Sequence, residues 1–363
     1  MTTTIYAMYN NKGGVGKTTL GFNLAAEFAA RHPDTQVLVI DLCPQANISQ
    51  YLLGGGDKGY ARNQQLQSKR TRSNVVGFLD WLLAGNSGFT SIPQSFKTNV
   101  HAHNNIIADN LFLIAGDSFL ESLALSLNYA VINPANRQAW RQYMTAFRRL
   151  CDLEHEDRYE DLVVFIDCNP SFSIYTQMAL VSSDKIIIPM MADYSSLEGL
   201  KGIMTLLYAH YPTAAAQTYA EKFITFHSQV SDNDLNLPKM ERFVFNNYTT
   251  NNGVATAYDA IKDALCNFAY QQFVSYPNLF STPSQPINNV GNWIASYLSE
   301  VKDFHTSGKV SATLGIPLLN LPAQTYYTMP NGEEVQVVRA RYEEARQHID
   351  QLVNKFQLIL SSD

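Results

Sequence analysis

Residues 9–19, which read YNNKGGVGKTT, constrain the fold of this chain more than any other segment. They follow an apolar run, residues 5–8, that predicts a β-strand, and they precede residues 20–30, where apolar side chains recur at helical spacing. A glycine-rich loop between a strand and a helix is the setting of a phosphate-binding loop, because backbone N–H groups and the helix N-terminus can face phosphate oxygens. This segment therefore predicts an α/β unit with an anion site.

The residue types in the loop predict what it binds. Lys17 is placed to reach the β- and γ-phosphates of a nucleotide, and the Thr18 hydroxyl is placed to hold Mg²⁺. The pattern GxxxxGK[ST] is not met, because Asn11 stands at its first glycine and a second lysine, Lys12, precedes the glycine pair. A glycine-rich turn without a ligand is the disfavoured alternative, since glycines, lysine and threonine all fall in register. The predicted nucleotide-binding residues of the loop are Asn11, Lys12, Gly13, Gly14, Val15, Gly16, Lys17, Thr18 and Thr19.

Two later apolar runs, residues 36–41 and 162–167, predict buried strands that each end in an aspartate. The carboxyl ends of parallel strands lie at one edge of the sheet, beside the phosphate loop. Asp41 can there hold Mg²⁺ through water, and Asp167 can approach the metal in the manner of a Walker B aspartate. The predicted metal ligands are therefore Thr18, Asp41 and Asp167. A purely structural aspartate at the end of the second strand is the less favoured alternative.

The composition of the chain narrows the classes of protein to which it can belong. The chain has 363 residues, 46% of them hydrophobic and 16% charged, which is enough to bury a sizeable core. Its net charge of −6 gives no overall attraction to nucleic acid or to an anionic membrane. The four cysteines lack CxxC spacing, so they indicate neither a zinc site nor a disulfide framework, and reduced thiols fit a cytoplasmic protein. We see no signal peptide and no apolar run long enough to span a membrane.

The variant KGGVGKTT resembles the deviant Walker A loop of the ParA/MinD family of nucleotide-dependent positioning ATPases. Residues 41–47 (DLCPQAN) resemble the switch I segment of that family, usually DxDPQxN, with Cys43 in place of its second aspartate. Residues 167–171 resemble its switch II turn, with Asn169 replacing the first proline. The resemblance is sharp at 10–19 and 36–47, fair at 162–200 and weak beyond 250. It implies a P-loop NTPase fold, a doubly wound and mostly parallel sheet flanked by helices.

The same resemblance implies ATP and Mg²⁺ as cofactors and a homodimer bridged by ATP, in which Lys12 reaches the nucleotide of the partner. The positions it implies for catalysis are Lys12, Lys17, Asp41 and Cys43. At position 43 the aspartate of the family orients or activates the attacking water, and a thiol is a weak substitute. We therefore expect a slow ATPase or none.

Asn246 is the candidate contact to the adenine base, because it ends the predicted strand at residues 243–246, where relatives place a polar residue. The asparagine-rich stretch 246–252 is equally explained as a turn with helix-capping residues.

Three functions compete. The first is a switch that partitions plasmids or chromosomes or positions cargo, bound to non-specific DNA or to an adaptor or cargo protein, in the cytoplasm and on the nucleoid. An ATP-locked scaffold that binds a protein rather than DNA is a variant of it. The second is a metabolic or reductase-like P-loop enzyme, which would need paired cysteines or a further substrate site. The third is a membrane-surface relative, which is disfavoured because after Arg346 only Lys355 is basic.

DNA binding is less well supported than ATP binding. No lysine or arginine occurs from Ala264 to Val301, and phosphate contacts need cations. A DNA surface would have to use residues 69–72 (KRTR) or the arginines of a predicted helix at 137–153, which are equally explained as a solvated helix face.

The rest of the pattern predicts one domain, residues 1–363, with insertions near 54–73, 85–109 and 211–240. We expect an exposed loop at 54–73 and irregular surface structure at 85–109. Further strands are predicted at 111–114 and 184–189, with 243–246 as the last central strand. The predicted helices are 75–83, 118–127, 137–153, 254–273, 293–304 and 338–360.

Overall fold

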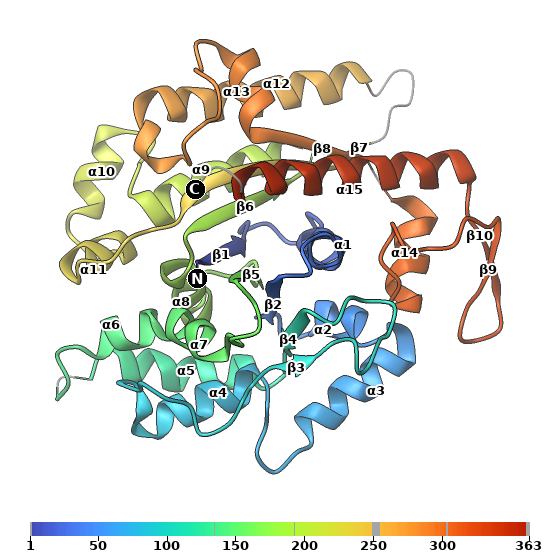
Figure 1. The fold of residues 1–363 in the computed structure, drawn as a ribbon. Coiled ribbons are helices and arrows are strands. Elements are labelled where there is room, and N and C mark those ends of the chain that lie inside the picture. The colour runs from blue at the N-terminus through green and yellow to red at the C-terminus, as the bar shows by residue number, and fades with distance from the viewer. Residues whose placement is uncertain (1, 134, 192, 249–254, 303, 361–363) are drawn as a thin grey trace.

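The computed structural model describes residues 2–133, 135–191, 193–248, 255–302 and 304–360 (Figure 1). Eight strands form one sheet in the order β3-β4-β2-β5-β1-β6-β7-β8. All neighbouring pairs in it are parallel except β3 with β4. The strands are β1 Thr3–Met8, β2 Thr35–Asp41, β3 Thr98–Asn99, β4 Leu111–Ile114, β5 Asp161–Asp167, β6 Lys185–Met190, β7 Lys239–Tyr248 and β8 Leu298–Lys302. The predicted doubly wound, mostly parallel sheet is confirmed.

Helices cover both faces of this sheet. The α-helices are α1 Lys17–Arg31, α2 Asn47–Leu52, α3 Gly56–Gln67, α4 Val75–Trp81, α5 Leu120–Val131, α6 Ala139–Met144, α7 Ala146–Glu154, α8 Ile174–Ser182, α9 Tyr194–Tyr208, α10 Ala214–Ala220, α11 Phe226–Asp232, α12 Ala255–Ser275, α13 Val290–Tyr297, α14 His305–Leu314 and α15 Arg339–Leu360. A π-helical turn (Leu82–Asn86) and a 3₁₀ turn (Pro277–Leu279) complete the helical segments. The strands β9 Tyr326–Thr328 and β10 Glu334–Gln336 form a separate antiparallel hairpin.

The central strand β1 shows why the sheet is covered on both sides. Its side chains alternate between two apolar cores: Ile5 and Ala7 belong to one, Tyr6 and Met8 to the other, and all are buried. Helices α4 to α9 and α13 contribute to the first core, and α1, α2 and α15 to the second. A parallel strand buried on both faces reads as a continuous apolar run, which is what its sequence shows.

The closing helix α15 packs beside α1 and β8 (Figure 1). Its apolar residues Ile349, Leu352, Val353 and Phe356 are buried in the second core, so core packing explains this stripe and a membrane-facing surface does not. Among the described residues, no helix is both long enough and apolar enough to cross a bilayer.

Several sequence-based expectations need correction. The expected loop at 54–73 contains α3, which is held by burial of Gly59, Asn63 and Leu66 in spite of its polar sequence. The predicted helix 137–153 is two helices, α6 and α7, separated at Thr145. The predicted helix 293–304 ends at residue 297 and continues as β8, an unpredicted edge strand beside β7.

Other expectations were only partly met or cannot be compared. The segment 85–109 is mostly irregular, as expected, but supplies the short strand β3. Residues 249–252 of the asparagine-rich stretch, and residue 254 at the start of a predicted helix, lie outside the described residues.

Candidate nucleotide-binding and metal site

The glycine-rich loop joins the end of β1 to the start of α1. Gly16, the N-cap of α1, has φ of +86°, a conformation that favours glycine. A Cβ atom on Gly16 would lie 1.8 Å from Nδ2 of Asn246. That amide donates a hydrogen bond of 3.0 Å to the carbonyl of Val15, so Asn246 at the end of β7 packs directly on the loop. Its Oδ1 is buried and has no hydrogen-bond partner among the described residues.

Lys17 is held by the loop that carries it. Its Nζ donates to the carbonyl oxygens of Asn10 at 3.1 Å and Lys12 at 3.0 Å, and the side chain is buried. Burial lowers the pKa of Lys17, and the nearby Asp167 carboxylate acts in the opposite direction. The ammonium group is therefore held by two carbonyl acceptors of its own loop.

The two predicted acidic strand ends meet beside this lysine. Asp41 of β2 and Asp167 of β5 are paired in the sheet register, and both are buried. The Thr18 hydroxyl donates to Asp167 Oδ2 at 2.8 Å, while Asp41 accepts from the amide and hydroxyl of Ser49 at 3.1 Å and 2.6 Å. Oxygen atoms of Asp41 and Asp167 and the sulfur of Cys43 all lie within 4.8 Å of one another. The structure thus brings the predicted metal ligands together.

Burial shifts the pKa of both carboxyl groups, and repulsion by Asp41 adds to the shift of Asp167. Burial raises the pKa of Asp41 to about 6, and burial together with the charge of Asp41 raises the pKa of Asp167 to about 7. Oδ1 of Asp167 is buried without a hydrogen-bond partner among the described residues. Two crowded carboxylates, one with an unpartnered oxygen, beside a threonine hydroxyl form an oxygen donor set of the kind that Mg²⁺ prefers. The residues therefore fit a divalent cation.

Cys43 lies against these acids instead of carrying a third carboxylate. It is 7% exposed, and its backbone N–H donates to Asp41 Oδ1 at 2.9 Å. Burial, followed by the charge of Asp167, raises the pKa of the Cys43 thiol well above its usual range. The side chain is therefore a neutral thiol at physiological pH and a weak hydrogen-bond partner for water.

The second lysine of the loop points away from the buried acids. Lys12 forms an ion pair through Nζ with Oδ2 of Asp193, the residue that precedes α9, and both side chains are partly exposed. Asn10 fixes the backbone here, since its Oδ1 accepts from the N–H of Lys12 at 3.0 Å and its Nδ2 donates to the carbonyl of Pro189 at 2.7 Å. The two lysines of one loop therefore have different surroundings: Lys17 is buried and Lys12 is partly exposed.

The family model described as an AAA domain, AAA_31, matches residues 3–214. The chain belongs to this family. Over 191 residues it is 30% identical to the chromosome-partitioning ATPase Soj of Treponema pallidum, a match that covers 53% of this chain and 58% of Soj. The chain spans about 60% of the length of the first curated relatives that it matches. The predicted resemblance to ParA-type ATPases is thus confirmed.

Solved structures show the same ParA-type fold. The structure of pNOB8 ParA has a TM-score of 0.56 at 13% identity and covers 99% of both chains. The ATP complex of a variant of Cyanothece McdA has a TM-score of 0.53 at 13% identity and covers 98% of this chain and 96% of McdA. At this identity the likeness concerns the fold alone.

The sequence did not predict one side of the candidate site, which the region of α14 forms. A pocket of about 500 Å³ opens over the loop, lined by residues 14–19, by Cys43, Gln45, Asn47, Tyr51, Pro170 and Asn246, and by Phe304, His305, Gly308, Lys309 and Ala312 from the region of α14. The α14 side chains reach the loop only through the tertiary fold, and their local pattern carries no phosphate-binding signal. Lys309 is exposed and lines this pocket, and its positive charge is the feature of the sequence that could have indicated this side of the site.

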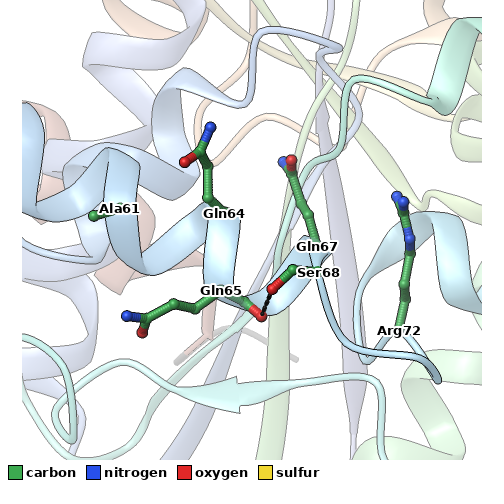
Figure 2. Close-up of a pocket in the computed structure, with 6 residues that line it drawn as sticks. All are labelled: Ala61, Gln64, Gln65, Gln67, Ser68 and Arg72. Atoms are coloured by element: carbon green, nitrogen blue, oxygen red, sulfur yellow. Dashed lines mark hydrogen bonds between the residues drawn. The ribbon is translucent and has the colours of Figure 1, made fainter.

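A second hollow lies away from the loop, on α3 (Figure 2). Its volume is about 570 Å³, and it is lined by Ala61, Gln64, Gln65, Gln67, Ser68 and Arg72. Arg72 is engaged by an ion pair with the buried Asp117. None of the predicted nucleotide or metal ligands lines this hollow, so the site of interest is the one over the loop.

Proposed function

We propose that this chain is an ATP- and Mg²⁺-dependent switch that dimerises when it binds ATP and that partitions a plasmid or chromosome or positions another large cargo. The observation that carries this proposal is the difference between the two lysines of the loop: Lys17 is buried and bound to carbonyls of its own loop, whereas Lys12 is partly exposed and pairs with Asp193. Because Lys12 is partly exposed, its ammonium group can contact a nucleotide that a second copy of the chain holds. Soj, named a chromosome-partitioning ATPase, and the McdA complex, named for its ATP, support the proposal.

In the proposed active site, Lys17 and the loop amides bind phosphates, and Thr18, Asp41 and Asp167 hold the metal directly or through water. The metal would neutralise charge on the β- and γ-phosphates when bound. Asn246 lines the pocket beside the loop and keeps an acceptor oxygen without a described partner, in keeping with a role in holding the base. We treat residues 1–363 as one ATPase unit, because β8 and α15, late in the sequence, complete the sheet and its second core.

Nucleotide binding is tested with Lys17→Ala. The substitution removes a charge-assisted contact to phosphate, so nucleotide retention should fall at least tenfold in an equilibrium binding assay. Lys201→Ala is the matched control, because Lys201 is a surface lysine whose described ion pair is with Glu198 on the same helix. Unchanged retention by the Lys17 variant would show that the loop is not the site.

Dimerisation is tested separately with Lys12→Ala. If Lys12 serves the partner, this variant should keep most of its ATP affinity as a monomer and lose ATP-dependent dimerisation. Light scattering with and without ATP measures the mass, and the Lys17→Ala protein supplies the monomer baseline. A Lys12 variant that dimerises like the wild type would rule out the bridging role.

The arrangement of cations bears on whether DNA or a protein is the partner. Of the arginines at 137–149, Arg148 pairs with Asp184, while Arg141 and Arg149 donate to backbone carbonyls. Lys69 and Arg70 are exposed beside the end of α3, and Arg72 is engaged by Asp117. Lys69 and Arg70 are therefore two adjacent exposed cations that a DNA surface could use, and Arg137 of the other candidate segment is exposed as well.

A salt titration of DNA retention, with and without ATP, tests this surface, with Lys69→Gln/Arg70→Gln as the variant. ATP-dependent retention that weakens with salt and is lost in the variant would support DNA. Failure of the wild type to bind DNA at low salt would favour a protein cargo. The reductase-like alternative gains no support, because the metal-competent cluster found among the described residues contains a single cysteine.

A further inference from the structure

Asp193 combines two roles in one carboxyl group. It is the N-cap of α9, where its Oδ1 accepts hydrogen bonds from the N–H of Ser196 at 2.9 Å and from the hydroxyl of Ser195 at 2.8 Å. Its Oδ2 accepts from Nζ of Lys12. One oxygen of Asp193 therefore caps the helix. The other binds Lys12 of the phosphate loop, which precedes Asp193 by 181 positions in the sequence.

The position of this carboxylate is set by tight packing between α9 and the start of the loop. A Cβ atom on Gly199 would lie 2.9 Å from Oδ1 of Asn10, and one on Gly202 would lie 2.4 Å from Nδ2 of Asn11. The helix can approach the loop this closely only because both positions are glycine. Asp193, one residue before this helix, is consequently held in register with Lys12 and is not a surface acid that meets a lysine by chance.

The charge state of Asp193 suits this role. Partial burial acts to raise its pKa, but hydrogen bonds from Lys12 and Ser195 outweigh burial and lower the pKa to about 2. The carboxylate is therefore ionised at any pH at which the protein works, and it presents a permanent counter-charge to Lys12.

We propose that Asp193 is a positioning residue that retains Lys12 in its own subunit and thereby sets the ATP concentration at which the chain dimerises. This inference rests on the proposed function, in which Lys12 reaches the nucleotide of the partner. When the dimer closes, the Lys12 ammonium exchanges the Asp193 carboxylate for phosphate oxygens. A symmetric dimer breaks two such ion pairs, while Oδ1 of Asp193 continues to cap α9.

The size of the effect follows from the exposure of the pair. The side chains of Lys12 and Asp193 are 21% and 42% exposed, so solvent screens their attraction. Partly exposed ion pairs of this kind change equilibria by factors of roughly one and a half to five each. With two pairs released for every dimer, removing the Asp193 charge should tighten ATP-dependent dimerisation by roughly two- to thirtyfold.

The test uses Asp193→Asn, which keeps an oxygen for the helix cap and removes the charge. Glu198→Gln is the matched control, because it removes an equal charge from the same helix at a residue that pairs with Lys201. Two properties are measured on nucleotide-free and ATP-bound full-length protein. One is the rate at which an amine-reactive reagent modifies Lys12, followed by mass spectrometry, and the other is the ATP concentration for half-maximal dimerisation.

We expect Asp193→Asn to speed the modification of Lys12 and to lower the half-maximal ATP concentration, with Glu198→Gln unchanged in both. Asp193→Asn should not restore ATP-dependent dimerisation when it is combined with Lys12→Ala. Unchanged labelling of Lys12 in Asp193→Asn would overturn the ion pair itself. Faster labelling together with unchanged or weaker dimerisation would overturn the retention role. If Lys12→Ala alone leaves dimerisation intact, the proposed function fails instead, and the labelling result still reports on the pair.

Discussion

Replacing Cys43 by aspartate should raise the rate of ATP hydrolysis and should destabilise the metal-free protein. The wild-type thiol is neutral and lies against Asp41 and Asp167, so it adds no charge to the acidic cluster. An aspartate at this position supplies an acceptor that can orient the attacking water. The same change adds a third carboxylate to a buried pair that already resists ionisation.

The electrostatic magnitude can be worked from the geometry. The three side chains offer atoms within 4.8 Å of one another. Two unit charges at that separation repel by about 3.5 kcal/mol at an effective dielectric constant of about 20. A carboxylate at position 43 faces Asp41 and Asp167, so full ionisation would cost about 7 kcal/mol, comparable with the stability of a whole domain. At least one acid should therefore stay protonated until Mg²⁺ neutralises the cluster.

Two assays follow from this reasoning. Phosphate release at saturating Mg²⁺ and ATP should rise about tenfold in Cys43→Asp, which corresponds to about 1.4 kcal/mol of barrier. Thermal unfolding in a chelator at pH 8 should occur at a lower temperature than in the wild type, and the difference should shrink on adding Mg²⁺ with ATP. Cys43→Asn is the control for size, because it introduces a polar side chain without a charge and should show neither change.

The outcome that would refute the reasoning is specific. Robust hydrolysis by the wild type, unaffected or reduced in Cys43→Asp, would mean that other residues handle the water. Equal unfolding temperatures of Cys43→Asp and wild type in the chelator would mean that position 43 does not face the two acids.

Three further predictions concern the metal and the loop. The pKa values of Asp41 and Asp167 are raised to about 6 and about 7, so Mg²⁺ binding should strengthen as pH rises from 5.5 to 7.5 and level off above that range. The pH profile of Asp167→Asn is the comparison that corrects for protonation of ATP itself. A flat profile for the wild type would contradict the pKa shifts. In the metal-free protein these raised values favour the folded state increasingly as pH falls from about 7 toward 4, which unfolding curves in a chelator should show. Gly16→Ala should lose ATP binding in equilibrium dialysis, because its Cβ would collide with Asn246, whereas wild-type affinity would show that this contact is absent in solution.

The parts of the site that could be predicted from the sequence are those encoded locally. The loop at 9–19 and the apolar strands ending in Asp41 and Asp167 carry periodicity and motif together, and the structure brings them to one edge of the sheet. Their proximity followed from the rule that parallel strands end at a common edge.

The missed parts depend on contacts that the local pattern does not reveal. Helix α3 has a polar, glycine-containing sequence whose intrinsic tendency favours a loop, and packing of Leu66 and Asn63 overrides it. The wall formed by α14 comes from the end of the chain, where no phosphate-binding motif marks it. Asp193 reads as an ordinary helix cap, and only the packing of α9 on the loop shows that it also holds Lys12.

The place of β1 in the sheet has a consequence for the order in which the protein can be made. Strand β1 pairs with β5 and β6, which begin at Asp161 and Lys185, and it has no pairing with its neighbour in sequence, β2. During synthesis β1 must therefore wait until the chain has left the ribosome as far as β5 and β6 before its partners exist. Topologies dominated by such distant pairings fold slowly and expose unpaired edges meanwhile. The phosphate loop is translated long before Asn246, so its packing against that side chain is completed only after the 231 positions that separate Val15 from Asn246 have been made.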